Sequence, residues 1–271
     1  MRRLPVSGWI GAVIVAVTVL FALVSLVWTP YDPVHAMPAD RLLGSSAEHL
    51  MGTDRYGRDV FSRIMSGAQI TLFVGLVAVG ISALIGVPLG ILAGMRLGWA
   101  ETLIMRGMDL TLAFPALLLA IVAGAAFGAS TLTAMIAIGI AGIPGFARVA
   151  RAGTLQVMTQ DYIASARVSR VPGIVIAQRH VLPNIAGVII VQASVAFALA
   201  ILAEAALSFL GLGTSPPDPS WGRMLQSAQA SLGSAPQLAL WPGLAIALTV
   251  LGFNLLGDGL RDVLDPSRRR R

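Results

Sequence analysis

Few residues of this chain are of types that could do chemistry, and their spacing does not favour catalysis. His35, His49 and His180 have no Cys, Asp or Glu partners at the spacing of metal ligands. The chain has no Cys, which excludes disulfides, thiolate nucleophiles and cysteine-bound metals. It also lacks the G-x-S-x-G and H-E-x-x-H patterns of hydrolytic sites. We therefore expect no catalytic residue and no metal site.

All 19 basic residues are Arg, and the absence of Lys restricts how the protein could use nucleotides. The phosphate-binding loop of nucleotide hydrolases, G-x-x-x-x-G-K-[ST], uses its Lys to contact the β- and γ-phosphates. A chain without Lys can form neither this loop nor a Schiff base. If ATP drives this protein, a separate chain must hydrolyse it, and we expect this chain to bind no cofactor.

The composition indicates that most of the surface faces lipid. The 271 residues are 56% apolar and 12% charged, whereas soluble domains average roughly 45–50% and about 25%. A helix needs about 20 apolar residues to cross a hydrocarbon core of roughly 30 Å. Long runs without any charged residue cover 4–31, 64–95, 110–147, 180–203 and 224–257.

These runs predict an all-α integral membrane protein with six transmembrane helices in a single domain, residues 1–271. The run 110–147 must fold back near 126–131, because as one helix it would extend about 57 Å. The first apolar stretch is too long for a signal peptide, so we expect an uncleaved span there. The six expected spans lie near 8–28, 70–94, 104–126, 131–150, 185–210 and 237–258.

The distribution of Arg predicts the orientation of these spans. With the N-terminus inside, the inside segments hold 14 Arg and the outside segments hold 5. Because positively charged loops stay in the cytoplasm, we expect both termini to be cytoplasmic, with the Arg268–Arg271 cluster as a topology anchor. Gly86, Gly90 and Gly94 recur at the spacing that lets helices pack closely in lipid.

Ionisable groups at membrane depth are costly and often mark a solute pathway. Glu204, in the outer part of the fifth expected span, is the clearest case. It could line the translocation path or pair across an interface, or it could bond to a neighbouring helix or to Ser208. Asp109 and Asp258 fall near cytoplasmic ends of spans, where hydration makes a carboxylate less costly.

The long loop 152–184 between the fourth and fifth spans is the most informative segment, since loops of this length are often functional. Residues 160–170 are expected to form a short helix, Pro172–Gly173 a turn, and residues 174–180 a second short helix. A soluble partner could bind these two helices at the cytoplasmic face. Alternatively, both could lie in the membrane interface as amphipathic helices.

Several motifs in this loop and beyond it resemble one known family. Asp161–Arg167 and Arg179–Asn184 resemble the cytoplasmic EAA loop of bacterial ABC-importer permeases. Three further stretches resemble C-type permeases of the dipeptide, oligopeptide and nickel importers, in the order expected for that family. They begin at Met51–Asp59 with Phe61–Arg63, at Leu207–Gly213 with Pro219–Gly222, and at Phe253–Asp262 with Leu264–Pro266.

The resemblance implies a type I ABC-importer permease fold in the inner membrane. It also implies a homologous B-type permease as partner and two cytoplasmic ATPase subunits that use ATP and Mg. An extracytoplasmic binding protein would dock on 30–69 and 211–236. No nucleic acid is expected as a partner. The loop would be a coupling helix inserted into an ATPase groove. The coupling residues implied are Asp161, Tyr162, Ile163, Ala164, Ser165, Ala166, Arg167, Arg170, Pro172 and Gly173.

The chain departs from the family pattern in this loop. Ala164–Ser165–Ala166 stands where the family usually carries Glu-Ala-Ala, and Arg170 stands where it usually carries the turn Gly. A non-glycine residue in the left-handed region is strained, so we expect the turn to have shifted to Pro172–Gly173.

The expected function is import of di- or oligopeptides, and the alternative cargo within the family is nickel or a metal chelate. The segment Ile201–Gly213 resembles the peptide importers more closely. A stand-alone channel or secondary transporter is a further alternative, although the chain shows neither an internal repeat nor paired broken helices. A membrane-embedded enzyme is disfavoured, because nucleophiles and acid–base groups are not clustered.

Overall fold

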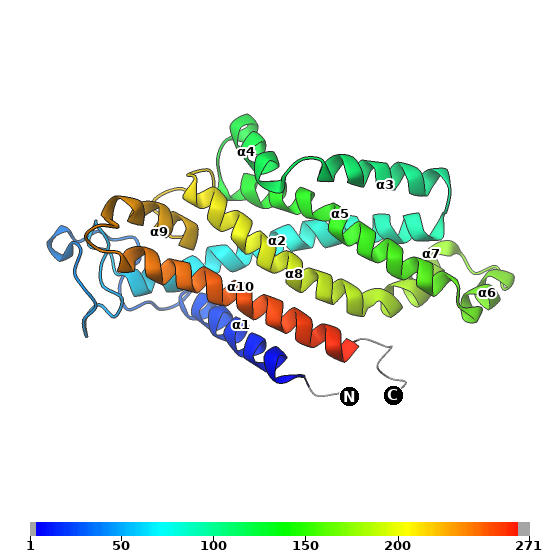
Figure 1. Cartoon of the computed structure of the whole chain (residues 1–271), viewed down its shortest axis with the longest axis horizontal. Helices are drawn as coiled ribbons and strands as arrows, with labels where there is room; N and C mark the ends of the chain where they lie inside the picture. Colours follow the sequence, from blue (N-terminus) through cyan, green and yellow to red (C-terminus); the bar gives the residue numbers. More distant parts are fainter. Residues whose placement is uncertain (1–3, 265–271) are drawn as a thin grey trace.

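The computed structural model describes residues 4–264, and every regular element in that range is a helix. This confirms the expected all-α architecture; Arg2, Arg3 and the Arg268–Arg271 cluster lie outside the described residues. The long helices run side by side along the length of the molecule (Figure 1). Within 4–264, five are long and apolar enough to cross a bilayer: α1 (Val6–Val24), α2 (Val60–Met95), α5 (Thr131–Met158), α8 (Leu182–Phe209) and α10 (Gln237–Leu264).

The third expected span is broken. Residues 104–126 form no continuous helix, because α3 (Trp99–Leu112) and α4 (Ala116–Phe127) meet at an angle of 79°. Pro115 lies at this break; it has no backbone N–H, and its ring disfavours a helical conformation of the residue before it. The described chain therefore has five spans, or six if the bent pair counts as one.

The helix α2 begins well before the expected start at residue 70. The Asp59 side chain caps it by accepting a hydrogen bond from the Ser62 backbone N–H at 2.7 Å. Arg63, which directly precedes the charge-free run 64–95, is inside the helix and only 3% exposed. Its Nη1 donates to the carbonyl oxygen of Pro33 at 2.6 Å. The charged residue therefore marked where the apolar stretch begins and not where the helix begins.

The glycine row of α2 packs directly against α5. A Cβ atom on Gly90 would lie 2.3 Å from the carbonyl oxygen of Ala147, and one on Gly86 would lie 2.6 Å from that of Ile143. These distances leave no room for a side chain, so the two backbones touch. The close packing expected from the spacing of the glycines is present.

The two ends of the molecule carry different short elements (Figure 1). One end, which we call the α9 end, holds the segment 25–59 and α9 (Trp221–Ala228). The opposite end, the α6 end, holds α6 (Asp161–Val168), with the start of α1 and the end of α10 directed toward it. The remaining short elements are η1 (Pro38–Asp40), α7 (Gly173–Ile176), the π-helical η2 (Ala177–Val181) and η3 (Gln229–Ser231).

Candidate functional site

The helix α6 is anchored to the bundle by one side chain. It follows α5 after a two-residue connection, Thr159–Gln160. Ile163 is fully buried and belongs to the apolar cluster that contains Ile176, Val181 and Ile185. Burial of one such side chain contributes about 1.5–3 kcal/mol, and Ala166 and Val171 pack against the same cluster.

The other face of α6 is uncovered. Tyr162 is 43% exposed and Val168 is 85% exposed, although neither belongs to a span. The exposed members of the expected coupling residues are Asp161, Tyr162, Ala164, Ser165, Arg167 and Arg170, whereas Ala166 is half-buried. A projecting helix with an apolar tip is a feature that a partner protein can cover.

The turn after α6 lies at Arg170, and the expected shift to Pro172–Gly173 is wrong. Arg170 has φ of 54°, in the left-handed region. Its N–H donates to the carbonyl oxygen of Arg167 at 2.9 Å, and the N–H of Val171 donates to that of Ala166 at 3.0 Å. This pair of bonds is the Schellman motif, in which the left-handed residue is usually Gly. The motif closes the helix with Arg170 in the strained position.

Pro172 and Gly173 start a helix and do not form a turn. Pro172 is the N-cap of α7, and Gly173 is its first residue. Residues 174–180 are helical, as expected, but they do not form a separate short helix, because α7 continues through the π-helical residues of η2 directly into α8. A π-helical segment inserts an extra residue into a helix without ending it. The segment from Gly173 therefore forms one continuous helical unit with the fifth expected span.

Glu204 lies buried inside the chain, at 1% exposure. Ser208 Oγ donates to its Oε1 at 2.7 Å, and the same hydroxyl accepts the backbone N–H of Thr214 at 3.0 Å. The segment that follows α8 covers this pair, since a Cβ on Gly213 would lie 2.3 Å from Ser208 Oγ. A bond between Glu204 and Ser208 was one of the structural roles considered from the sequence. A pathway role for Glu204 stays a prediction.

The remaining expected carboxylates lie apart from Glu204. Asp109 accepts a hydrogen bond from Arg148 Nη2 at 2.7 Å, which links α3 to α5, while Asp258 is exposed. Within residues 4–264, no three His, Cys, Asp or Glu side chains approach closely enough to hold a metal ion. The carboxylate of Asp109 therefore joins two helices.

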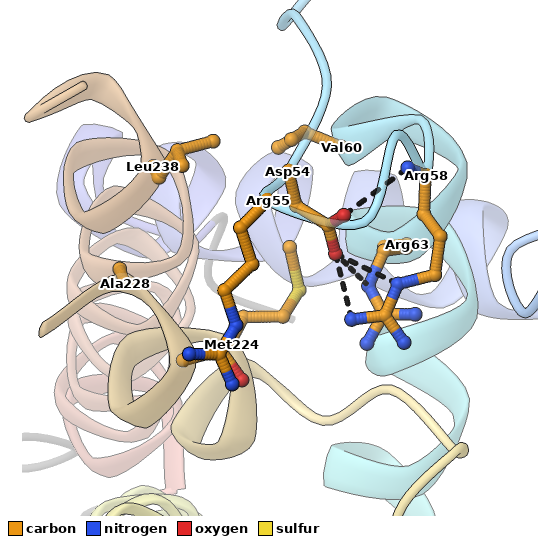
Figure 2. Close-up of a pocket in the computed structure, with 9 residues that line it drawn as sticks. Asp54, Arg55, Arg58, Val60, Arg63, Met224, Ala228 and Leu238 are labelled. Atoms are coloured by element: carbon orange, nitrogen blue, oxygen red, sulfur yellow. Dashed lines mark hydrogen bonds and ion pairs between the residues drawn. The ribbon is translucent and has the colours of Figure 1, made fainter. Parts of the chain in front are cut away.

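A buried group of charges at the α9 end was missed by sequence reasoning. We call Arg55, Arg58 and Arg63, together with the carboxylate of Asp54, the arginine cluster (Figure 2). Arg58 Nε donates to Asp54 Oδ2 at 2.8 Å, and Arg63 Nε lies 3.8 Å from the same oxygen. These residues lie in the segment 30–69 that is expected to receive the binding protein, but no cluster of charges was predicted within it. Three Arg within nine residues at the start of a helix were the available signal.

Comparison with known proteins assigns the chain to a family. Residues 86–270 match the family model described as binding-protein-dependent transport system inner membrane component. The chain belongs to this family. It is accordingly a multi-pass protein of the inner membrane, as the sequence predicted.

Named relatives of this family of permeases align over most of the chain. The chain is 43% identical to the dipeptide transport system permease protein DppC of Alkalihalophilus pseudofirmus over 260 residues, which covers 96% of this chain and 86% of that protein. It is 46% identical to the glutathione transport system permease protein GsiD of Pectobacterium atrosepticum, over 88% of this chain and 79% of that protein. GsiD of Escherichia coli is also 46% identical, over 94% and 85%.

A solved ABC transporter shares the fold of this permease. A chain of the MetNI methionine ABC transporter in an inward-facing conformation superposes with a TM-score of 0.61 at 16% identity. The superposition covers 74% of this chain and 96% of the MetNI chain. The likeness at this identity establishes a common fold, and it confirms the type I permease architecture expected from the motifs.

Proposed function

We propose that this chain is the membrane-spanning subunit of an ATP-driven importer of di- or oligopeptides. It would pair with a homologous permease to form the translocation path. Two cytoplasmic ATPase subunits would bind ATP and Mg²⁺, and an extracytoplasmic binding protein would deliver the cargo. The relatives named for dipeptide and glutathione transport support a peptide cargo, since glutathione is itself a small peptide. Import of nickel or a metal chelate remains the alternative.

The observation that carries this proposal is the exposed, anchored helix α6. A two-residue connection joins it to α5, and the strained Arg170 turn joins it to the unit that runs from Gly173 through α8. A force on α6 would therefore reach two spans through short, ordered links. We propose that α6 is the coupling helix and that the α6 end is cytoplasmic. Rigid-body movement of spans against each other is a common route to alternating access.

A cavity next to α6 supports such movement. It has a volume of about 730 Å³ and lies between the C-terminal part of α2 and the α7–α8 unit. Met95, Met158 and Leu182 contribute to its mostly apolar wall, and Arg167 of α6 lies at its edge. Because this space adjoins both α2 and the α7–α8 unit, a movement of that unit relative to α2 would change the volume of the cavity.

A charge placed on the tip of α6 tests the coupling role. Val168→Asp adds a carboxylate at a side chain that is 85% exposed, whereas Val27→Asp adds one at a side chain that is 88% exposed near the α9 end. We expect Val168→Asp to weaken binding of the ATPase subunits and to reduce ATP-dependent peptide uptake into proteoliposomes by about tenfold or more. Val27→Asp should leave ATPase binding unchanged.

Two results would count against the proposal. Equal uptake by wild type and Val168→Asp, with both proteins inserted to the same level, would remove α6 from the coupling pathway. Peptide uptake by the purified chain without any ATPase subunit would favour a stand-alone channel or secondary transporter. Uptake of nickel but not of peptides by the complete transporter would select the alternative cargo.

A further inference from the structure

A small cavity at the α9 end is lined by an unusual number of guanidinium groups. Its volume is about 200 Å³, and it lies between the loop that holds the arginine cluster, the segment after α8, and α9. Tyr56, which is 44% exposed, lines it as well. Four Arg line the cavity: Arg55, Arg58, Arg63 and Arg223.

The charges of this cavity do not balance. Arg58 and Arg63 are 9% and 3% exposed, and they share the single carboxylate of Asp54. Among residues 4–264, no carboxylate lies within ion-pair distance of Arg55, and its buried Nε has no hydrogen-bond partner. Arg55 is half-buried, and a charge that is partly withdrawn from water is costly unless a counter-charge or hydrogen bonds compensate it. The cavity is therefore short of negative charge.

Nearby groups supply only part of the negative charge that four guanidinium groups would need. Arg223 Nη1 bonds to the neutral amide oxygen of Gln226, and Arg55 and Arg58 both lie over the ring of Tyr56, at 4.7 Å from its centroid. Asp218 also lines the cavity, so four guanidinium groups face two carboxylates, those of Asp54 and Asp218. A planar carboxylate could accept paired N–H bonds from such groups.

The size of the cavity indicates what kind of carboxylate enters. Sites for small molecules typically measure about 300–1,000 Å³, whereas this cavity of about 200 Å³ accommodates a single side chain. Several of its lining residues are exposed, among them Tyr56, Pro217 and Asp218, and the cavity lies at the end of the molecule opposite α6. A side chain that projects from a protein docked on this end meets both conditions.

We propose that this cavity receives one Asp or Glu side chain of the extracytoplasmic binding protein. The inference rests on the proposed function, which places the α9 end outside the cytoplasm. The carboxylate would compensate the surplus charge of Arg55 and Arg223 and would fix the register in which the binding protein docks. Asp54 is a positioning residue, because it holds Arg58 and Arg63 in the wall.

Substitution of the cavity arginines tests this docking site. The complete transporter, with its partner permease and ATPase subunits, is placed in lipid nanodiscs, and the affinity of its purified, peptide-loaded binding protein is measured over a series of salt concentrations. We expect Arg55→Gln and Arg223→Gln to weaken binding by about tenfold and to flatten its salt dependence. Arg55→Lys keeps the charge but loses the planar fork, so it should bind with intermediate affinity.

Arg106→Gln is the matched control, because Arg106 is an exposed Arg on α3 that lies outside the two docking segments and does not line the cavity. It should bind like wild type. Co-purification of each variant with the ATPase subunits shows that it has folded. Arg223→Gln alone carries the test if Arg55→Gln fails to assemble, because Arg223 lies on α9 and outside the arginine cluster.

Equal affinity for wild type, Arg55→Gln and Arg223→Gln would overturn the inference while leaving the proposed function intact. Unchanged affinity combined with a raised KM for peptide uptake would also overturn it, and would assign the cavity to a carboxylate of the cargo. No binding of the binding protein to the wild-type complex would instead contradict the proposed function, and this inference with it.

Discussion

Replacing Arg170 by Gly should stabilise the end of α6. Arg170 is one of two described non-glycine residues with positive φ, at 54°, and it lies where the Schellman motif usually has Gly. The substitution removes the contact between Cβ and the following carbonyl group without removing either hydrogen bond of the motif. Both bonds are donated by backbone N–H groups, those of residues 170 and 171.

The size of the effect follows from two opposing terms. A non-glycine residue in the left-handed conformation costs roughly 1–2 kcal/mol. Gly has more freedom in the unfolded chain, which offsets about 0.5–1 kcal/mol of that gain. The net stabilisation should be about 0.5–1 kcal/mol, and this corresponds to an opening equilibrium smaller by about two- to fivefold.

Hydrogen–deuterium exchange of the peptide that spans α6 measures this opening directly, after correction for the intrinsic exchange rate of Gly. Arg170→Gly should slow exchange of the Val171 amide, which donates to Ala166. Arg167→Gly is a control of opposite sign, because Arg167 lies within the helix, where Gly costs about 1 kcal/mol. Arg170→Ala removes the same charge but keeps a Cβ at the strained position, so it should not slow exchange.

Two outcomes would refute the reasoning. Faster exchange in Arg170→Gly, similar to that in Arg167→Gly, would show that the turn is not strained. Slowing of equal size in Arg170→Ala would show that the charge of Arg170, and not its backbone conformation, destabilises the turn.

Two further predictions concern packing and burial, and both are read from thermal unfolding in detergent micelles. Gly90→Ala should destabilise the protein by about 1–3 kcal/mol, because its Cβ would lie 2.3 Å from the Ala147 carbonyl oxygen. Gly107→Ala, whose Cβ meets nothing within 4 Å, should be neutral or stabilising, and an equal loss in both variants would contradict the packing argument. Ser208→Ala should cost about 1–3 kcal/mol, since it removes the donor to Glu204 and the acceptor of the Thr214 N–H. Ser165→Ala, which removes an exposed hydroxyl, should change stability by less than about 0.5 kcal/mol, so similar losses in the two Ser variants would argue against a buried network.

The sequence alone was sufficient to predict a helical membrane protein of the importer-permease family. Apolar runs report lipid contact because each residue contributes its own transfer free energy, and that property needs no knowledge of distant neighbours. A close approach of α2 to another helix was also readable from the spacing of Gly86, Gly90 and Gly94, but only the structure identifies α5 as its partner. The anchoring of α6 by Ile163, and the exposure of its other face, were not readable in this way.

Charged residues at the ends of helices were where sequence reasoning failed. Arg63 directly precedes an apolar run, yet it is buried inside α2, where Asp54 and the Pro33 carbonyl oxygen are its polar partners. Arg170 occupies a left-handed turn because the Schellman bonds and the packing of Val171 against the bundle determine its φ. A prediction from backbone propensity alone places that turn at Pro172–Gly173.

The tertiary structure alone decided which polar groups share one environment. The hydrogen bond from Ser208 to Glu204 is local and could be anticipated, but the cover over it comes from a segment that folds back after α8. The cavity lined by Arg55 and Arg223 unites residues far apart in the chain. A side chain's cost of burial depends on partners that only the folded chain brings near, so the fold determines whether a charge is solvated, paired or left available for a partner.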